Sequence, residues 1–142
     1  MHISFAVFAD AANLSQEGKL NILGVFDAVQ VAGLPTIHPR THFVVRLKAN
    51  STDAGTHVIA FRWLNPRDEE LWSSSGEMTV ATPPNPVFEV DLPIIACVDL
   101  PLNSAGQYRM EVVLDGTPTA EARLIVSGPP PAMMPATGPM FS

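Results

Sequence analysis

The amino-acid sequence predicts an all-β protein: an antiparallel β-sandwich of about eight strands, with an Ig-like or jelly-roll-like topology. Three observations lead to this prediction. Apolar and polar residues alternate with a period of two in several short stretches. Turn-forming residues separate these stretches at the spacing found in sandwiches. No stretch sustains the i, i+3, i+4, i+7 apolar pattern of an amphipathic helix.

The clearest element is a hairpin within the segment from Leu100 to Val126. Asp115-Gly116 divides it, and this dipeptide suits a tight turn that requires positive φ. The lead-in to Tyr108 is typical of a late sandwich strand, in which a Tyr ring packs in the core and its hydroxyl bonds back to the backbone. The residues expected to face inward are Tyr108, Met110, Val112, Leu114, Ala120, Ala122, Leu124 and Val126.

Further strands precede this hairpin. They are expected at residues 2–13, 20–31, 42–49, 56–64, 71–81 and 87–92, with 93–98 as a continuation or bulged edge. Gly18 marks the first turn, and Gly24 marks a bulge or close backbone approach inside the second strand. Residues 33–40 are predicted as a loop because they contain two prolines. The inward positions expected on the central strands are Phe43, Val45, Leu47, Ile59, Phe61 and Trp63.

Two stretches are apolar on both faces of their strand. The first strand has one face formed by Ile3, Phe5, Val7 and Ala9 and the other by Ala6 and Phe8, so both faces are expected to be covered. The run from Pro93 to Val98 contains the single cysteine, Cys97, which we expect to be a small buried hydrophobic residue. One cysteine excludes an internal disulfide and permits a reducing compartment.

Residues 1–127 are predicted as the sandwich domain and residues 128–142 as an extended, Pro- and Met-rich tail. The tail has five prolines in fifteen residues, a composition that favours polyproline-like backbone. Its apolar side chains are suited to docking on a groove of another chain. The alternative is that the tail folds back over its own domain. The anchors expected to bind a partner are Met133, Met134, Met140 and Phe141.

Composition narrows the class of partner. The formal net charge is −6 and the pI about 5.0, which disfavours nucleic acid and anionic membrane surfaces. Charged residues make up only 15% of the chain, which points to a partner-covered face, although a surface rich in Ser, Thr and Asn also accounts for it. The N-terminus has no basic region of a signal peptide, and no apolar run is long enough to span a membrane. We therefore predict a cytoplasmic protein, either free or peripheral to a membrane complex.

No group of residues predicts catalysis or metal binding. Asp10 and Asp27 occupy matching places in the first hairpin, where they either pair as carboxylates or, more simply, cap strand ends. Three serines at positions 73–75 lack the surroundings of a nucleophile. The histidines His2, His38, His42 and His57 read as solvated positions. Three rings that could form a sugar platform, Trp63, Trp72 and Tyr108, are mostly on inward positions. We expect no catalytic residue, metal or cofactor.

The segment Phe8–Asp27, together with Gly106, Tyr108 and Asp115-Gly116, resembles a group of small bacterial and phage proteins classed as a domain of unknown function. The resemblance covers roughly residues 3–126 and excludes the tail. It implies a β-sandwich and mildly supports a structural or accessory role. It implies no catalytic residues, because its markers are turn and core residues.

We therefore predict a non-enzymatic accessory or structural subunit that docks on a larger protein assembly, partly through its tail. The assembly is either a membrane-bound complex, bound on its cytoplasmic side, or a phage or tail-like particle. A ligand- or glycan-binding module, with a concave pocket and exposed rings, is one alternative. A hydrolase in which Asp10 and Asp27 converge in a cleft is another.

Overall fold

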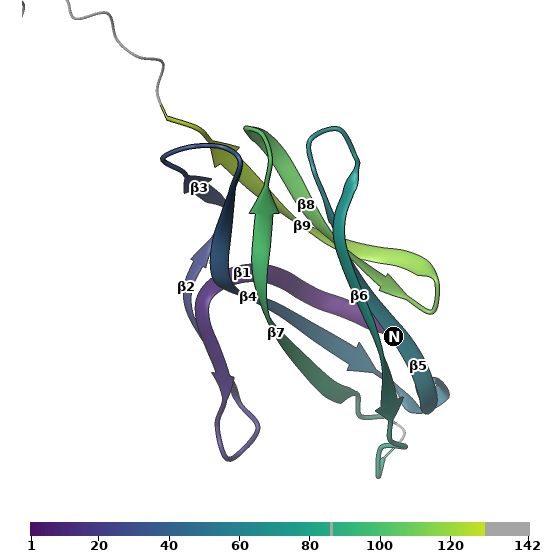
Figure 1. The fold of residues 1–142 in the computed structure, drawn as a ribbon. Helices are drawn as coiled ribbons and strands as arrows, with labels where there is room; N and C mark the ends of the chain where they lie inside the picture. Colours follow the sequence, from purple (N-terminus) through teal and green to yellow (C-terminus); the bar gives the residue numbers. More distant parts are fainter. Residues whose placement is uncertain (86, 130–142) are drawn as a thin grey trace, which may run out of the picture.

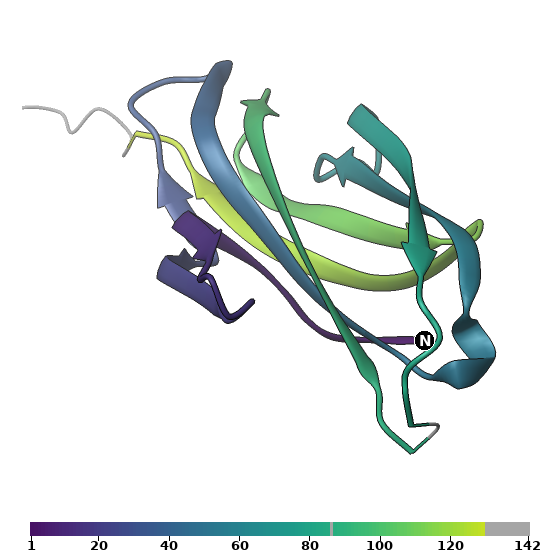
Figure 2. The ribbon, with the colours of Figure 1, turned by 90° about the horizontal axis from the view of Figure 1, so that it is seen from below.

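A computed structural model describes residues 1–85 and 87–129 of the chain, and it has the predicted all-β sandwich (Figures 1 and 2). Nine strands and one short 3₁₀ helix make up the described part. They are β1 (His2–Leu14), β2 (Leu20–Phe26), β3 (Ala28–Gln30), β4 (Thr36–Ala49), η1 (Ser51–Asp53), β5 (Gly55–Leu64), β6 (Glu70–Val80), β7 (Val90–Leu102), β8 (Gly106–Leu114) and β9 (Thr117–Ser127). Within these residues, no helix has the length and apolar character to cross a membrane.

The strands form two sheets that face each other. Sheet A has the order β2-β1-β4-β7, and sheet B has the order β3-β9-β8-β5-β6. All neighbouring pairs are antiparallel except β3 and β9, which are parallel. Figure 2 shows the two layers side by side, with β1 of sheet A across from β9 of sheet B. The predicted antiparallel sandwich is therefore confirmed, with one parallel pair that the sequence did not indicate.

The core lies between the sheets and is built from the inward residues of both. The stacked rings of Trp63 and Tyr108, with centroids 5.2 Å apart, lie near its centre. The indole Nε1 of Trp63 donates to the carbonyl of Pro101 at 2.9 Å, which satisfies the one polar group of this buried ring. The inward positions predicted on β4, β5, β8 and β9 are confirmed, because all but the half-buried Ala120 are buried in this core.

Tyr108 ties β8 to the segment before it. Its hydroxyl accepts the backbone N–H groups of Asn103 and Ser104, both at 2.9 Å, and lies 2.8 Å from the Ser104 carbonyl, to which it can donate. The ring is fully buried. The predicted contact between this hydroxyl and the backbone is confirmed.

The hairpin of β8 and β9 has the predicted turn. Asp115 has φ of 48° and Gly116 has φ of 80°, so both central residues lie in the left-handed region that this tight turn requires. Gly24 also has positive φ, at 72°, and a Cβ there would collide with the carboxylate of Asp10. The close approach predicted at Gly24 is therefore confirmed.

Two predicted elements were wrong. The single strand expected at 20–31 is two strands, because the chain leaves sheet A at Asp27 and continues as β3 in sheet B. The loop expected at 33–40 is largely strand, since β4 begins at Thr36. A bulge between His38 and Thr41 accommodates Pro39 and the positive φ of Arg40 in a strand that continues on both sides.

The burial predicted for Cys97 was also wrong, because this residue is exposed. Cys97 lies opposite His42 on the outer face of sheet A, while the next residue, Val98, faces the core. The apolar run around Cys97 favours burial, but the residue's place on the outer face of sheet A leaves it open to solvent. The outer face of this sheet is instead apolar and open to solvent at several positions.

Candidate functional site

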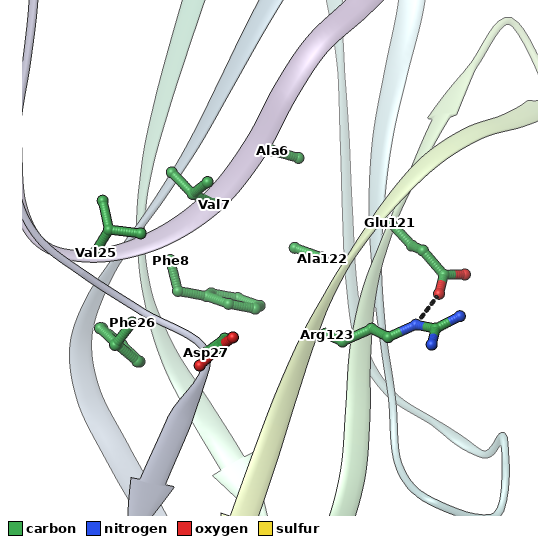
Figure 3. A pocket seen from close by; sticks show the side chains of 9 residues that line it. All are labelled: Ala6, Val7, Phe8, Val25, Phe26, Asp27, Glu121, Ala122 and Arg123. Carbon is green, nitrogen blue, oxygen red and sulfur yellow. Dashed lines mark hydrogen bonds and ion pairs between the residues drawn. The ribbon is translucent and has the colours of Figure 1, made fainter.

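An apolar hollow lies at the seam where one edge of sheet A meets one edge of sheet B. The chain itself crosses between the sheets here, from β2 through Asp27 to β3. The resulting pocket has a volume of about 450 Å³ (Figure 3). We call it the seam pocket; it is lined by Ala6, Val7, Phe8, Val25, Phe26, Asp27, Glu121, Ala122 and Arg123.

The floor of the seam pocket is apolar and fixed by the core. Phe8 is buried, and its ring packs against Phe26, Phe43 and Trp63 with centroid distances of 6.2, 5.2 and 5.8 Å. Ala122 of β9 closes the floor from sheet B (Figure 3). An apolar side chain entering the pocket would meet preformed carbon surface, and no core side chain would have to leave.

The rim of the pocket is charged. Arg123 Nε donates to Glu121 Oε2 at 2.8 Å on the outer side of β9 (Figure 3). Both side chains are exposed, so this ion pair adds little to stability. Asp27 stands on the opposite rim, and its main-chain carbonyl accepts the N–H of Ile125 at 2.9 Å. This hydrogen bond fixes the point where the chain enters sheet B.

Two strand edges next to the pocket have no ladder partner among the described residues. β2 pairs with β1 only from Phe8 onward, so residues 2–7 of β1 pair with β4 alone. β3 pairs with β9 only at residues 125–127, so residues 117–124 of β9 pair with β8 alone. Unpaired edges of this kind are templates for an added strand.

The seam pocket continues onto the outer face of sheet A. The residues opposite each other in the sheet show which side chains share that face: Val7 with Val44 and Ile95, and Ala9 with Val25. Two side chains of β2 on this face, Leu23 and Val25, are 72% and 59% exposed. We call this surface the apolar face and define it as Phe5, Val7, Leu23, Val25, Ile95 and Cys97.

The carboxylates singled out from the sequence do not share a pocket. Asp27 lines the seam pocket, whereas Asp10 lines a second hollow of about 400 Å³ together with His38, Arg40 and His42. The two carboxylates therefore line different hollows, and the hydrolase alternative stays untested.

Two histidines, His38 and His42, line the second hollow. His38 Nδ1 lies 2.7 Å from the hydroxyl of Thr41, and its ring lies 5.5 Å from that of Phe26. His42 Nδ1 is shielded from solvent and has no hydrogen-bond partner in the part of the chain that the structure describes. Among residues 1–85 and 87–129, no three His, Cys, Asp or Glu side chains are placed to hold a metal ion.

His57 is not a freely solvated residue, as the sequence suggested. Its Nδ1 lies 2.7 Å from Asp115 Oδ2, and its Nε2 lies 2.6 Å from the carbonyl of Asp53. Both neighbours are acceptors, so the doubly protonated ring fits best. The hydrogen bond with Asp115 is the main reason that the pKa of His57 is raised, and it likewise lowers the pKa of Asp115. No local pattern indicates the contact with Asp115, because this residue is 58 positions away from His57 along the chain.

The three rings considered for a sugar platform do not form one. Trp63 and Tyr108 are fully buried, and Trp72 is partly buried against the core. The serines at 73–75 lie on β6 and pair with β5. The predicted anchors Met133, Met134, Met140 and Phe141 lie outside the described residues.

Sequence reasoning missed the seam pocket. Phe8 and Ala122 are predicted as apolar strand residues, but no local pattern indicates that the edges of two sheets meet there. The crossing of the chain at Asp27 creates the pocket, and the sequence from 20 to 31 reads as uninterrupted strand.

The sequence model of one protein family matches residues 4–127, and that family is described as Family of unknown function (DUF6941). The match extends from β1 to the end of β9, so it covers both edges of the seam. No curated protein matches the sequence. The predicted resemblance to a family of unknown function is thereby confirmed, while a bacterial or phage origin stays a prediction.

Proposed function

The chain belongs to the family of unknown function DUF6941, and we propose that it is a non-enzymatic subunit that docks on a larger protein assembly. The observation that carries this proposal is the continuity of the apolar face with the seam pocket through Val7 and Val25. An exposed apolar surface that leads into a hollow flanked by unpaired strand edges is typical of a protein-binding surface.

The low charge of the chain supports the same proposal. Its charged residues are few, and the outward positions on the central part of sheet A are apolar except for His42, which lies between Ala9 and Cys97. A partner that covers this area would remove apolar surface from water without burying unpaired charges. In this proposal the assembly is a membrane-bound complex, engaged on its cytoplasmic side, or a phage-like particle. Met133, Met134, Met140 and Phe141 of the tail contribute to docking.

Co-purification from the producing cells with matched surface variants tests the proposal. Leu23→Lys places a charge in the apolar face, and Val58→Lys places one at an exposed position on the other side of the sandwich, on β5. Neither side chain is in the core, so both variants should fold. Leu23→Lys is expected to reduce recovery of the partner subunits about tenfold, equivalent to about 1.4 kcal/mol of binding. Val58→Lys should recover them as the wild type does.

Equal recovery with both variants would contradict docking through the apolar face. A third variant, which lacks residues 128–142, shows in the same co-purification whether the tail contributes to docking. If that chain recovers the partner subunits normally, the tail is not a docking anchor, although the sandwich surface still is.

A further inference from the structure

The edge strands of the two sheets differ in how well they can pair with another strand. Sheet A ends at β2 and β7, and sheet B ends at β3 and β6. β2 is interrupted by the positive φ of Gly24, β3 has three residues, and β7 contains Pro93 and Pro101, which donate no hydrogen bond. β6 has eleven residues, none of them a proline and none with positive φ. A further strand could therefore bond to β6 along its whole length.

The middle of β6 is open on both of its faces. All five residues from Ser73 to Glu77 are exposed, whereas Trp72 and Met78 on either side are partly buried against the core. Gly76 lies opposite the core residue Ile59, and a Cβ built on it would meet no atom of a non-neighbouring residue within 4 Å. The described part of the chain therefore leaves this stretch of the edge uncovered.

The hydrogen-bonding groups on this edge follow from the pairing of β5. The carbonyl of Val58 accepts the N–H of Asp115, so the even-numbered residues of β5 point to β8 and its odd-numbered residues point to β6. The odd residues of β5 lie opposite the even residues of β6, which therefore bond to β5. The odd residues of β6 present their N–H and C=O groups to the open edge. These residues are Ser73, Ser75, Glu77 and Thr79.

We propose that two copies of this chain pair through β6, antiparallel and about a two-fold axis at Ser75, so that their B sheets form one continuous sheet. In this register every residue of β6 lies opposite a residue of the second copy, because Ser75 is the midpoint of the strand. Ser73 then lies opposite Glu77 of the second copy, and Trp72 lies opposite Met78 of the second copy.

The outer face of the paired strands is complementary in charge. Arg62 lies opposite Ser73 in the sheet, so Glu77 of the second copy is two strands away from Arg62, about 10 Å between Cα atoms. Extended Arg and Glu side chains span that distance. Arg62 bonds to Glu70 through Nε and to Glu111 through Nη1, and neither bond uses Nη2. The two-fold symmetry supplies this ion pair twice.

The inner face of the paired strands is complementary in shape. Trp72 and Met78 are each only partly buried within one copy, and the pairing places the indole of one copy beside the sulfur of the other. Met adapts to an aromatic ring and gains a favourable sulfur contact there. Between these pairs Ser74 lies opposite Gly76, where small residues let the two backbones approach. An unrelated strand would not supply these matches, so they favour a second copy.

Oxidative cross-linking of the full-length protein tests the pairing and its register. In a Cys97→Ser background, Ser75→Cys places two thiols opposite each other with Cα atoms about 5.5 Å apart, which suits a disulfide. Ser73→Cys is the matched control, because its two copies are four residues out of register, about 13 Å apart. Ser75→Cys should form a covalent dimer about tenfold faster or more. Equal rates, or faster cross-linking of Ser73→Cys, would overturn the proposal.

Analytical ultracentrifugation over a dilution series measures the same dimer without a cross-link. Glu77→Lys places an ammonium beside Arg62 of the second copy and should raise the dissociation constant about tenfold or more. Glu17→Lys makes the same change of charge in the exposed turn between β1 and β2 and should leave it unchanged. Both variants alter exposed residues, so both should fold.

A monomeric wild type would overturn the proposal, as would equal effects of the two lysine variants. The pairing does not rest on the proposed function, because β6 belongs to sheet B and the apolar face belongs to sheet A. Failure here therefore leaves the co-purification test of docking unaffected.

Discussion

The two outer faces of the sandwich differ in chemistry although both cover the same core. The outer face of sheet B has a row of ion pairs across β6, β5, β8 and β9: Glu70–Arg62, Arg62–Glu111, Arg109–Glu111, Arg109–Glu121 and Arg123–Glu121. The equivalent area of sheet A is apolar, and Arg46, Lys48 and Asp91 lie toward one end of it.

The ion pairs of the outer face of sheet B contain many of the few charged side chains of the chain. Sheet B has the pattern of a sheet with one face in water, while sheet A is apolar on both faces. Val44 and Ala9 are fully buried although they lie outside the core cluster, because side chains of the apolar face surround them. Sheet A is therefore the side suited to burial against another protein.

The largest expected effect comes from placing a charge under the apolar face. Val44→Asp puts a carboxylate where the side chain has no access to water, and we expect a loss of about 3 kcal/mol or more in the free energy of unfolding. Val113→Asp is the matched change on the outer face of sheet B, where the side chain is partly exposed, and should cost about 1 kcal/mol. Urea denaturation measures both. Equal losses would mean that the two faces do not differ in burial.

A smaller effect is expected within the row of ion pairs. Glu111 is only 14% exposed and accepts from Arg62 Nη1 at 2.7 Å. Glu111→Gln should therefore lower the free energy of unfolding by about 1 kcal/mol. Glu70→Gln removes a pair with the same Arg62, but at an exposed carboxylate, and should cost less than about 0.5 kcal/mol. The reverse order in denaturation would show that burial does not determine the strength of these pairs.

The smallest expected effect is a pH dependence of stability at the end of sheet B. His57 contacts the carboxylate of Asp115 and the main-chain carbonyl of Asp53 there. The carboxylate of Asp53 forms an ion pair with the Met1 ammonium. Because the pKa of His57 is raised in the folded protein, the contact stabilises the fold fully at pH below the ordinary pKa of 6.5. This stabilisation is lost as the pH rises through the folded-state pKa. The pKa of Asp115 is lowered, so the stabilisation that its carboxylate provides is lost only at pH below about 4.

Thermal unfolding between about pH 5 and pH 9 measures this effect. The wild-type Tm should fall relative to that of His57→Gln as pH rises. His2→Gln is the control. The side chain of His2 is exposed, and its Nδ1 lies 3.6 Å from Glu89 Oε2, which is also exposed. If His57→Gln retains the wild-type slope, the contact between His57 and Asp115 does not contribute to stability.

The core was predictable from the sequence, and the seam pocket was not. Alternation identified the buried residues of β8 and β9, and Asp115-Gly116 identified their turn, because these signals are local. The crossing at Asp27 has no local signal. Residues 20–31 suit a strand throughout, and only pairing with β1 and then β9 decides where the strand divides.

The apolar face shows a second limit of sequence reasoning. The run around Cys97 is apolar on both faces, and a single sequence does not distinguish a face covered by its own chain from one left open. The same ambiguity led to the wrong prediction of burial for Cys97. The expectation that both faces of the first strand are covered stays a prediction, because the neighbouring residues Leu23 and Val25 on the outer face of sheet A are exposed.

The reactivity of Cys97 measures most directly whether the apolar face is covered in the cell. This residue is the single cysteine of the chain and is exposed on that face, so a maleimide reagent reports its access to solvent. The account predicts fast labelling of the purified protein and at least about tenfold slower labelling of the same chain within its native assembly. Labelling at the same rate in both would contradict docking through the apolar face.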